Sequence, residues 1–419
     1  MLPWALPGGP LGSGTKSPCP TPLKILFLSQ RVPYPPNRGD KITTWRLIER
    51  MSRNHDVHVV TFAHDQGDMD AAENLRGKGF EVSVFRHRAK LAKLLALPNL
   101  LTTKPLTLGV FGSTSLQIEV NRLAKSCDLM YAFSSSMGAF MLRHKLPRVM
   151  HFAELDSDKW LQYAERTSGP MSWVYRREYK TLFHFETVLA NAVDDNIFCT
   201  PLEEKIFQER IPGPPSTVIR NGVDLTHLRP EPVQAGVASS IEPDHLIFVG
   251  VMDYLPNVEG CKWFVHEILP KIRARRPQVR LSIVGSNPTP EVEQLGQEPG
   301  VTVTGFVDDP KDWLRRAAVS IAPLRIARGI QNKVLEAMAM GLPVVGTTSA
   351  TQGVGGEPGR DFLLEDSVDG QVQAICGLLE DPPGARELGQ RGRLFVEGRY
   401  DWEVCFQPLD ELLNRLGPD

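Results

Sequence analysis

The strongest constraint on the fold is a strand–helix rhythm that runs through the chain twice. Short, nearly continuous apolar runs are typical of buried parallel strands, and apolar residues recurring every three or four positions are typical of amphipathic helices. The first series of runs is KILFLSQ, DVHVVTF, EVSVF, LMYAFSS, RVMHFAEL and NIFCT, with one long helical stretch expected at about 157–190. This alternation predicts an α/β fold with doubly wound, Rossmann-like parallel sheets.

A proline-containing stretch at 230–244 separates this series from a second one, and it is expected to be a linker. The second series consists of HLIFVGV, VRLSIVG, VTVTGFV, VSIAPL and LPVVGTT. We therefore predict one Rossmann-like domain over 23–229 and another over 245–400. Residues 1–22 are expected to be a disordered extension, and 401–419 an amphipathic helix that packs back on the N-terminal domain.

Composition narrows the class of protein. Lys and Arg number 47 against 49 Asp and Glu, so the net charge of −2 excludes bulk neutralisation of nucleic acid, and no nucleic-acid partner is expected. No apolar run reaches the roughly 18 residues that a membrane span needs. The 6 cysteines form no CxxC pair, which favours reduced thiols in a cytoplasmic protein without a zinc site.

Ligands of parallel sheets bind beyond the carboxyl ends of the strands, so the loops after strands are the candidate sites. The richest is IAPLRIARGIQNKVLEAMAMGLPVV, in which Lys333 and Glu336 share one helix face near its start. A carboxylate among apolar residues needs a partner such as a sugar diol. Lys333, Arg325, Arg328 and the helix N-terminus suit a diphosphate. The alternative is a structural ion pair between Lys333 and Glu336, with both arginines in solvent.

NKVLEAMAMGLPVV resembles the donor-binding helix of family 4 glycosyltransferases, which have the GT-B fold, and IRNGVD resembles a second hallmark of that family. Several stretches are also similar to sugar transferases of PEP-CTERM/exosortase exopolysaccharide systems: RVPYPPNRGDKI, DSDKWLQYAER, PNVEGCKWF, RGIQNKVLEAMAMG and RGRLFVEGRYDW. The resemblance covers nearly the whole chain. It implies two Rossmann-like domains facing each other across a cleft. It also implies transfer of a sugar from a UDP- or GDP-linked donor to a glycan or lipid-linked acceptor, with retention, in exopolysaccharide biosynthesis.

The resemblance also assigns roles to residues. Family 4 places two glutamates eight positions apart in the donor site. Glu336 matches the second, which holds the ribose hydroxyls, and Arg328 stands in place of the first. Lys333 and Arg328, with Arg325 in support, are expected to neutralise the leaving diphosphate. The predicted donor-binding residues are Gly39, Arg325, Gly329, Asn332, Lys333 and Glu336.

In the first domain the resemblance points to Gly39 and His151. Gly39 follows the first strand, where the family keeps a glycine so that backbone N–H groups can approach the donor; a simple turn glycine is the alternative. His151 is expected to face the cleft as a catalytic residue, and a core histidine is the alternative. Asp156 and Asp158 have the spacing of a DxD metal motif but are expected to begin a helix. We predict no metal and no cofactor besides the donor substrate.

The segment FRHRAKLAKLLALPNLL mixes four Arg and Lys residues with many leucines. It could rest on the inner face of the plasma membrane, which would suit a lipid-linked acceptor, or it could be an ordinary helix with a basic outer face. Two alternatives to a transferase also stay open. One is a non-catalytic sugar-nucleotide-binding component of polysaccharide assembly, and the other is a nucleotide-sugar epimerase with the GT-B fold.

Overall fold

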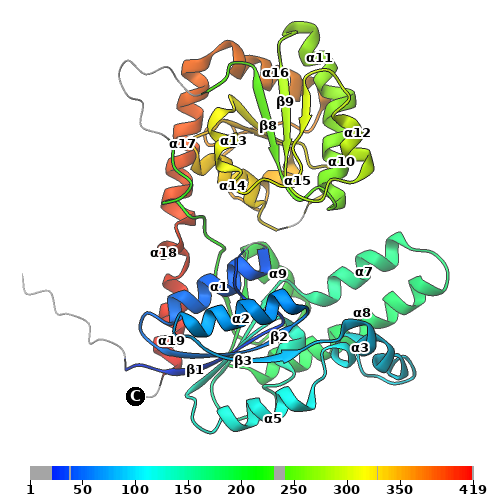
Figure 1. Cartoon of the computed structure of the whole chain (residues 1–419), viewed down its shortest axis with the longest axis vertical. Helices are drawn as coiled ribbons and strands as arrows, with labels where there is room; N and C mark the ends of the chain where they lie inside the picture. Colours follow the sequence, from blue (N-terminus) through cyan, green and yellow to red (C-terminus); the bar gives the residue numbers. More distant parts are fainter. Residues whose placement is uncertain (1–20, 37–38, 231–240, 328, 418–419) are drawn as a thin grey trace, which may run out of the picture.

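Two parallel sheets organise the chain, one in each of two domains (Figure 1). The computed structural model describes residues 21–36, 39–230, 241–327 and 329–417. All strand pairs in both sheets are parallel, which confirms the predicted α/β class. The predictions for most of the N-terminal extension, most of the linker and Arg328 lie outside the described residues.

The N-terminal sheet has the strand order β3-β2-β1-β4-β5-β6-β7. Its strands are β1 (Lys24–Ser29), β2 (Asp56–Ala63), β3 (Glu81–Arg86), β4 (Leu129–Phe133), β5 (Arg148–Ala153), β6 (Asp195–Phe198) and β7 (Ser216–Val218). Ile25 and Phe27 belong to one core cluster, whereas Leu26 and Leu28 belong to another. Successive side chains of a strand point to opposite faces, so β1 is buried on both sides, as its continuous apolar run predicts.

The helices that cover this sheet are α1 (Gly39–Met51), α2 (Gln66–Gly77), α3 (Ala89–Ala96), η1 (Leu97–Leu101), α4 (Leu106–Val110), α5 (Thr114–Leu123), α6 (Ser135–Gly138), α7 (Asp156–Arg166), α8 (Pro170–Ala192) and α9 (Pro201–Arg210). The prediction of one continuous helix at 157–190 is wrong. The chain reverses at Gly169, which has φ 76, and Pro170 begins a second helix. Proline lacks the N–H that a continuing helix needs but suits a first turn. Helices α7 and α8 form a hairpin that projects from the domain (Figure 1).

The C-terminal sheet has the order β10-β9-β8-β11-β12-β13. Its strands are β8 (His245–Val249), β9 (Arg280–Val284), β10 (Val301–Val303), β11 (Val319–Ala322), β12 (Val344–Gly346) and β13 (Leu363–Leu364). Its helices are α10 (Leu255–Trp263), η2 (Phe264–Ile268), α11 (Leu269–Arg275), α12 (Pro290–Leu295), α13 (Lys311–Arg316), α14 (Asn332–Ala339), α15 (Thr348–Thr351), α16 (Val368–Glu380) and α17 (Pro382–Tyr400). The five predicted strands are present. The two-residue β13 was not predicted, because so short a run has no periodicity to detect.

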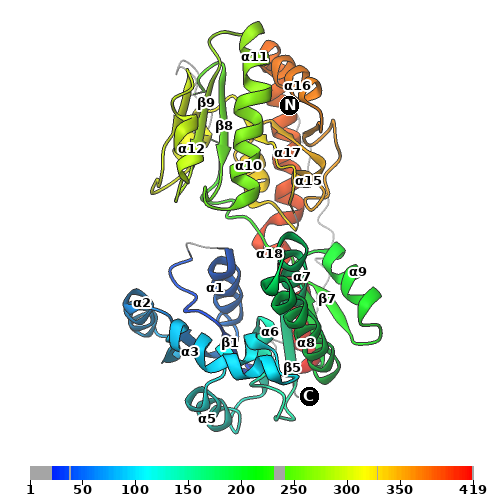
Figure 2. The same ribbon diagram turned by 90° about the vertical axis from the view of Figure 1, so that its right-hand side faces the viewer.

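The end of the chain crosses back to the N-terminal domain (Figure 2). Helix α17 lies along the C-terminal domain, and α18 (Trp402–Cys405) and α19 (Gln407–Leu416) follow it. Leu409 and Leu412 of α19 are buried in the core of the N-terminal domain. The side chain of Arg50 on α1 donates to Asp410 at 2.5 Å. The tail is two helices instead of the single predicted one, because Pro408 starts a new first turn.

Candidate functional site

Lys333 lies where α14 begins, beyond the carboxyl end of β11. Its Nζ donates to Oδ1 of Asn257 at 2.6 Å and lies 5.0 Å from the ring centroid of Phe248. Asn257 in turn donates from Nδ2 to the carbonyl oxygen of Val251 at 2.8 Å. Burial lowers the pKa of Lys333 to about 8, and the nearby side chains of Cys261 and Glu336 partly oppose this shift. The ammonium group is therefore fixed at the loop that follows β8, where it is partly shielded from water.

Glu336 lies three positions after Lys333, a little less than one turn of α14. Burial raises the pKa of its carboxyl group, and the charge of Lys333 opposes that rise. The structure describes both residues and contains no salt bridge between them within 4.0 Å. The short contact of the lysine is to Asn257 instead. The closed ion pair considered from the sequence is thus absent, which leaves the carboxylate of Glu336 as an acceptor for hydroxyl groups.

Backbone packing beneath these side chains requires glycine. A Cβ on Gly285, which has φ +149, would lie 1.7 Å from the carbonyl oxygen of Gly250. A Cβ on Gly250 would lie 2.7 Å from Nδ2 of Asn257. The loops after β8 and β9 therefore touch backbone to backbone, and they hold Asn257 against Lys333. Sequence reasoning missed Gly250, Gly285 and Asn257, although a glycine directly after each of two apolar strands was a readable signal.

The remaining predicted donor residues of the C-terminal domain lie on the same loop and helix start. The guanidinium of Arg325 is 5.8 Å from the ring centroid of Trp263, and Asn332 is exposed at the first position of α14. Gly329 has φ 65, a conformation that favours glycine. Its carbonyl oxygen would lie 2.1 Å from a Cβ placed on Gly353. This loop is thus shaped by a close backbone approach from the segment that follows β12.

Exposed apolar side chains surround this edge of the C-terminal sheet. They lie on the loops after β8, β10 and β11 and at the first residue of α10: Val251, Tyr254, Leu255, Phe306 and Ile326. Phe306 is 74% exposed and Tyr254 55% exposed. Such side chains could contact the flat face of a nucleobase.

Gly39 is the first residue of α1 in the N-terminal domain. A Cβ placed on it would meet no atom within 4 Å. Packing inside the chain therefore does not demand glycine here. The functional interpretation, close approach of a donor, stays a prediction.

The prediction that His151 faces the cleft is wrong. Its side chain is fully buried in the middle of β5, at 0% exposure. Nδ1 is 2.7 Å from the hydroxyl of Tyr131, and Nε2 is 3.7 Å from Sγ of Cys199. Burial lowers the pKa of His151 to about 3, so the ring is neutral at physiological pH. His151 is a core histidine, because alternation along β5 puts its side chain on the same face of the sheet as Val149, where Tyr131 of the neighbouring strand lies.

The carboxyl edge of the N-terminal sheet holds a strained polar turn that sequence reasoning did not find. Ser134 has φ 79 and Ala153 has φ 65, and they stand at the ends of the neighbouring strands β4 and β5. Asp156 accepts from the backbone N–H of Ser135 at 3.2 Å and from its hydroxyl at 2.5 Å. Strained backbone of this kind persists only where the surroundings enforce it, and it is frequent at functional sites.

Asp156 is the first residue of α7, so the expectation that this motif begins a helix is confirmed. Asp158 forms an ion pair with Arg210. Among the residues that the structure describes, no cluster of three or more His, Cys, Asp or Glu side chains is arranged to hold a metal ion. Nor, within the same residues, is any helix both long and apolar enough to cross a membrane.

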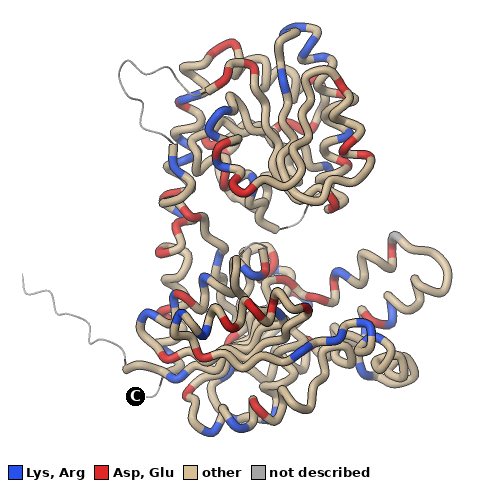
Figure 3. The backbone as a smooth tube through the Cα atoms, viewed as in Figure 1, with Lys and Arg blue, Asp and Glu red and all other residues tan. Residues whose placement is uncertain are grey.

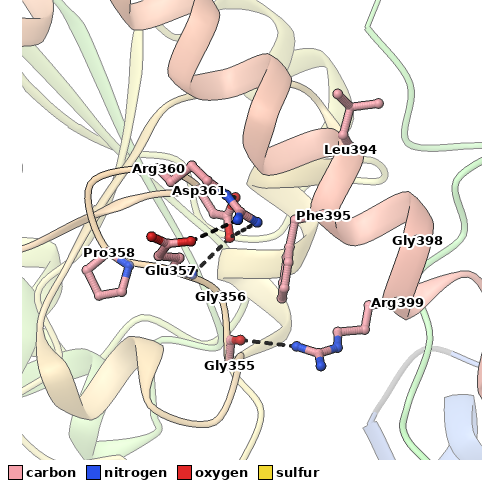
Figure 4. A pocket seen from close by; sticks show the side chains of 10 residues that line it. All are labelled: Gly355, Gly356, Glu357, Pro358, Arg360, Asp361, Leu394, Phe395, Gly398 and Arg399. Atoms are coloured by element: carbon pink, nitrogen blue, oxygen red, sulfur yellow. Dashed lines mark hydrogen bonds and ion pairs between the residues drawn. The ribbon is translucent and has the colours of Figure 1, made fainter.

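One cavity of about 670 Å³ lies between the loop at 355–361 and α17 (Figure 4). Arg360 there pairs with Glu357 and Asp361, and Arg399 donates to the carbonyl oxygen of Gly355 at 3.2 Å. None of the predicted site residues lines this cavity. Its cations are engaged by neighbouring acceptors, so it is not the predicted donor site.

The model of the glycosyl transferases group 1 family matches residues 243–381. This span contains β8 to β13 and helix α14, which carries Lys333 and Glu336. The match thus covers the sheet of the C-terminal domain and about a third of the chain. Its core helix α14 is the segment on which the resemblance to the donor-binding helix rests.

Curated relatives match to different extents. An uncharacterized 44.6 kDa protein in the cps region of Klebsiella pneumoniae is 18% identical over 92% of this chain and 98% of its own length. Phosphatidyl-myo-inositol mannosyltransferase of Mycolicibacterium smegmatis is 33% identical, over 46% of this chain and 50% of its own. The chain thus spans nearly all of the first relative and half the length of the second.

Solved structures share the whole architecture. Anabaena Alr3699/HepE in complex with UDP superposes with a TM-score of 0.67 at 19% identity, covering 94% of this chain and 100% of that one. Sucrose-phosphate synthase of Thermosynechococcus elongatus also gives 0.67, at 20% identity, covering 94% and 99%. These likenesses concern the fold, and they confirm the GT-B architecture.

Proposed function

We propose that this protein is a glycosyltransferase that moves a sugar from a UDP- or GDP-linked donor to a glycan or lipid-linked acceptor. The observation that carries the proposal is the arrangement of Lys333 and Glu336 on α14, within the span that the family model matches. Each is held partly out of water, and no salt bridge joins them. A partly buried cation and a partly buried carboxyl that form no ion pair with each other are expected where a ligand supplies the opposite charge and the hydroxyl donors.

The two side chains suit the two ends of a nucleoside diphosphate. The ammonium of Lys333, beside the start of α14, would hold the diphosphate, and a dianion there would raise the pKa of the lysine and keep it charged. Negative charge grows on this group as the glycosidic bond breaks, so a fixed cation stabilises the transition state. Glu336 would accept hydrogen bonds from the ribose diol. Exposed Tyr254 and Phe306 offer rings for the base.

The substrates named for related proteins and structural neighbours support a nucleotide-sugar donor. Anabaena HepE binds UDP, and a Corynebacterium glutamicum relative is a GDP-mannose-dependent mannosyltransferase of a phosphatidylinositol mannoside. The likeness to a protein of the Klebsiella cps region, over nearly its whole length, supports a role in exopolysaccharide biosynthesis. We further propose retention at the anomeric carbon, no metal, and acceptor binding by the N-terminal domain. Closure of the two domains would exclude water and limit hydrolysis of the donor.

Turnover of a panel of UDP- and GDP-sugars, with and without extracted lipid and glycan acceptors, tests the proposal. We expect acceptor-dependent release of one nucleoside diphosphate, together with a glycosylated product seen by mass spectrometry. The variant Glu336→Gln should lose this activity. The matched control Glu259→Gln should keep it, because Glu259 forms an exposed pair with Lys262 at the same spacing on α10.

Other outcomes would contradict the proposal in distinct ways. Conversion of the donor to a different nucleotide sugar without acceptor would indicate an epimerase. Tight nucleotide binding without any turnover, in the presence of all acceptor fractions, would indicate a non-catalytic assembly component.

A further inference from the structure

Helix α3 and the turn η1 that follows it expose a run of leucines. Five are more than four-tenths exposed: Leu91 at 47%, Leu94 at 63%, Leu95 at 70%, Leu97 at 51% and Leu101 at 92%. Ala96 is the one buried residue of α3. Single exposed leucines are ordinary, but five within about three turns concentrate apolar surface in one short segment, which calls for a partner. We name these five residues the leucine surface.

Contacts with α4 and α8 on the opposite side of the segment keep the leucine surface toward solvent. A Cβ on Gly109 of α4 would lie 2.8 Å from Cβ of Ala96, so α4 packs tightly against α3. Arg177 of α8 donates to the carbonyl oxygens of Asn99 at 2.5 Å and of Lys104 at 2.9 Å. The fully buried Glu178 accepts from the backbone N–H of Leu106 and Thr107 at 2.7 and 2.8 Å. These contacts fix the far side of the segment, so the leucines cannot turn into the core.

Positive charge accompanies the leucines. From Val82 to Ile118 the chain contains no Asp or Glu. The same stretch carries five cations, all of them exposed: Arg86, Arg88, Lys90, Lys93 and Lys104. Figure 3 colours Lys and Arg blue along the backbone. None of them forms a salt bridge with any residue that the structure describes. Apolar side chains flanked by cations that no described carboxylate neutralises complement a surface that is apolar within and anionic at its boundary.

The hairpin extends this surface with an aromatic residue. Trp173, near the start of α8, is 60% exposed, and Met171 is 47% exposed. Trp173 precedes Arg177 by four residues, so both lie on the face of α8 that meets η1. Tryptophan is enriched where an apolar phase meets water.

We propose that the leucine surface, with Trp173 and the adjoining cations, docks on an anionic lipid bilayer. The leucines would enter the boundary between headgroups and acyl chains, and the cations would lie at the level of the lipid phosphates. The docking rests on exposure and charge and does not depend on the proposed function. Neither the family match nor the relatives assign this surface.

The position of the surface also indicates the class of acceptor, and this step rests on the proposed function. Directly after β3, the ring of His87 stacks on Phe111 at 5.1 Å and lies 4.8 Å from the ring of His64. Nε2 of His64 is 3.0 Å from the carbonyl oxygen of Gln30, whose side chain donates to Ser136 at 2.5 Å. These polar residues follow β2, β1 and β4. A membrane at the leucine surface would thus bring a lipid-anchored acceptor to the carboxyl edge of the N-terminal sheet.

Vesicle co-sedimentation of the full chain tests the docking. We expect binding to equimolar phosphatidylglycerol and phosphatidylcholine, weak binding to phosphatidylcholine alone, and loss of binding in high salt. The double variant L94Q/L95Q should lower the partition coefficient at least ~10-fold. L394Q is the matched control, because Leu394 on α17 is 67% exposed and distant in sequence, and it should bind like wild type.

A charge variant tests the second half of the proposal. Each cation at an anionic surface contributes about 1 kcal/mol, or roughly fivefold, so K90E/K93E should lower binding by about 25-fold or more. The control K125E alters an exposed lysine in the turn after α5 and should have little effect. Thermal melting of all variants should match wild type, since every substituted side chain is exposed.

Three results would overturn the docking. They are absence of vesicle binding by wild type, unchanged binding by both double variants, and concentration-dependent self-association that L94Q/L95Q abolishes. The last would show that a second copy of the chain covers the leucines. Nucleotide-induced stabilisation, measured in the same samples without vesicles, separates this question from the proposed function. If nucleotides fail to bind but L94Q/L95Q still loses vesicle binding, the proposed glycosyltransferase function is rejected and the proposed membrane docking is supported.

Discussion

Removing the charge of Lys333 should make the free protein more stable while abolishing donor binding. A lysine whose pKa falls from its usual 10.5 to about 8 carries a penalty on the order of 3 kcal/mol in its charged form. The variant Lys333→Met keeps the apolar stem and removes the charge. It also gives up the hydrogen bond to Asn257, which contributes about 1–1.5 kcal/mol. We expect the free energy of unfolding to rise by about 1.5–2 kcal/mol at pH 7 without ligand.

The pH dependence provides an independent signature. Below about pH 8 the lysine is charged in both the folded and unfolded states, so the full penalty applies. As the pH rises from 8 toward 10.5, the folded state releases its proton first, and the unfolded state binds more protons. The free energy of unfolding therefore rises over that window because of Lys333. This rise should be present in wild type and absent in Lys333→Met.

Urea denaturation of both proteins across that pH range measures these effects. The control Lys262→Met removes an exposed lysine paired with Glu259 and should change stability by less than about 0.5 kcal/mol. The reasoning would be refuted if Lys333→Met were less stable than wild type at pH 7. It would equally be refuted if the variant kept the rise of stability with pH.

Three further substitutions test the packing around the site and the crossing of the chain. Gly285→Ala should lower the free energy of unfolding by more than about 3 kcal/mol, measured by thermal denaturation, because the new Cβ would meet the backbone of the loop after β8. The control Gly377→Ala should be neutral or stabilising, because no atom lies within 4 Å of a Cβ at that helical position. His151→Leu should lower the melting temperature by leaving the Tyr131 hydroxyl without its partner, yet leave turnover per folded molecule within about threefold, whereas a catalytic role would produce a far larger loss. Leu409→Ala should cost about 2–5 kcal/mol and, by calorimetry, weaken the N-terminal domain, because α19 is part of its core; destabilisation confined to the C-terminal domain would contradict that packing.

The sheets were predictable because their central strands are buried on both faces. Phe27 and Leu28 show this: both are at 0% exposure although they point to opposite sides of β1. The hairpin of α7 and α8 was not predictable from periodicity, since amphipathic spacing continues through both helices. Only the pair Gly169–Pro170 marked the reversal.

The candidate site was predictable where its residues are neighbours in sequence. Lys333 and Glu336 stand on one helix face because of their spacing. Asn257, the partner of Lys333, is 76 positions away, and only the folded sheet brings it there. His151 was misplaced for a related reason. The alternation along a strand buried on both sides does not say which side chains stay inside the core.

The central claim is that Lys333 and Glu336 form the binding site of a nucleoside diphosphate. The most direct measurement is thermal stabilisation by UDP, GDP, ADP and CMP, applied to wild type, Glu336→Gln and the control Glu259→Gln. At a hundred times its Kd, a ligand adds about 2.7 kcal/mol of stability. The account predicts a shift with UDP or GDP that is lost in Glu336→Gln and kept in Glu259→Gln. No shift with any nucleotide, or an equal shift in both variants, would contradict it.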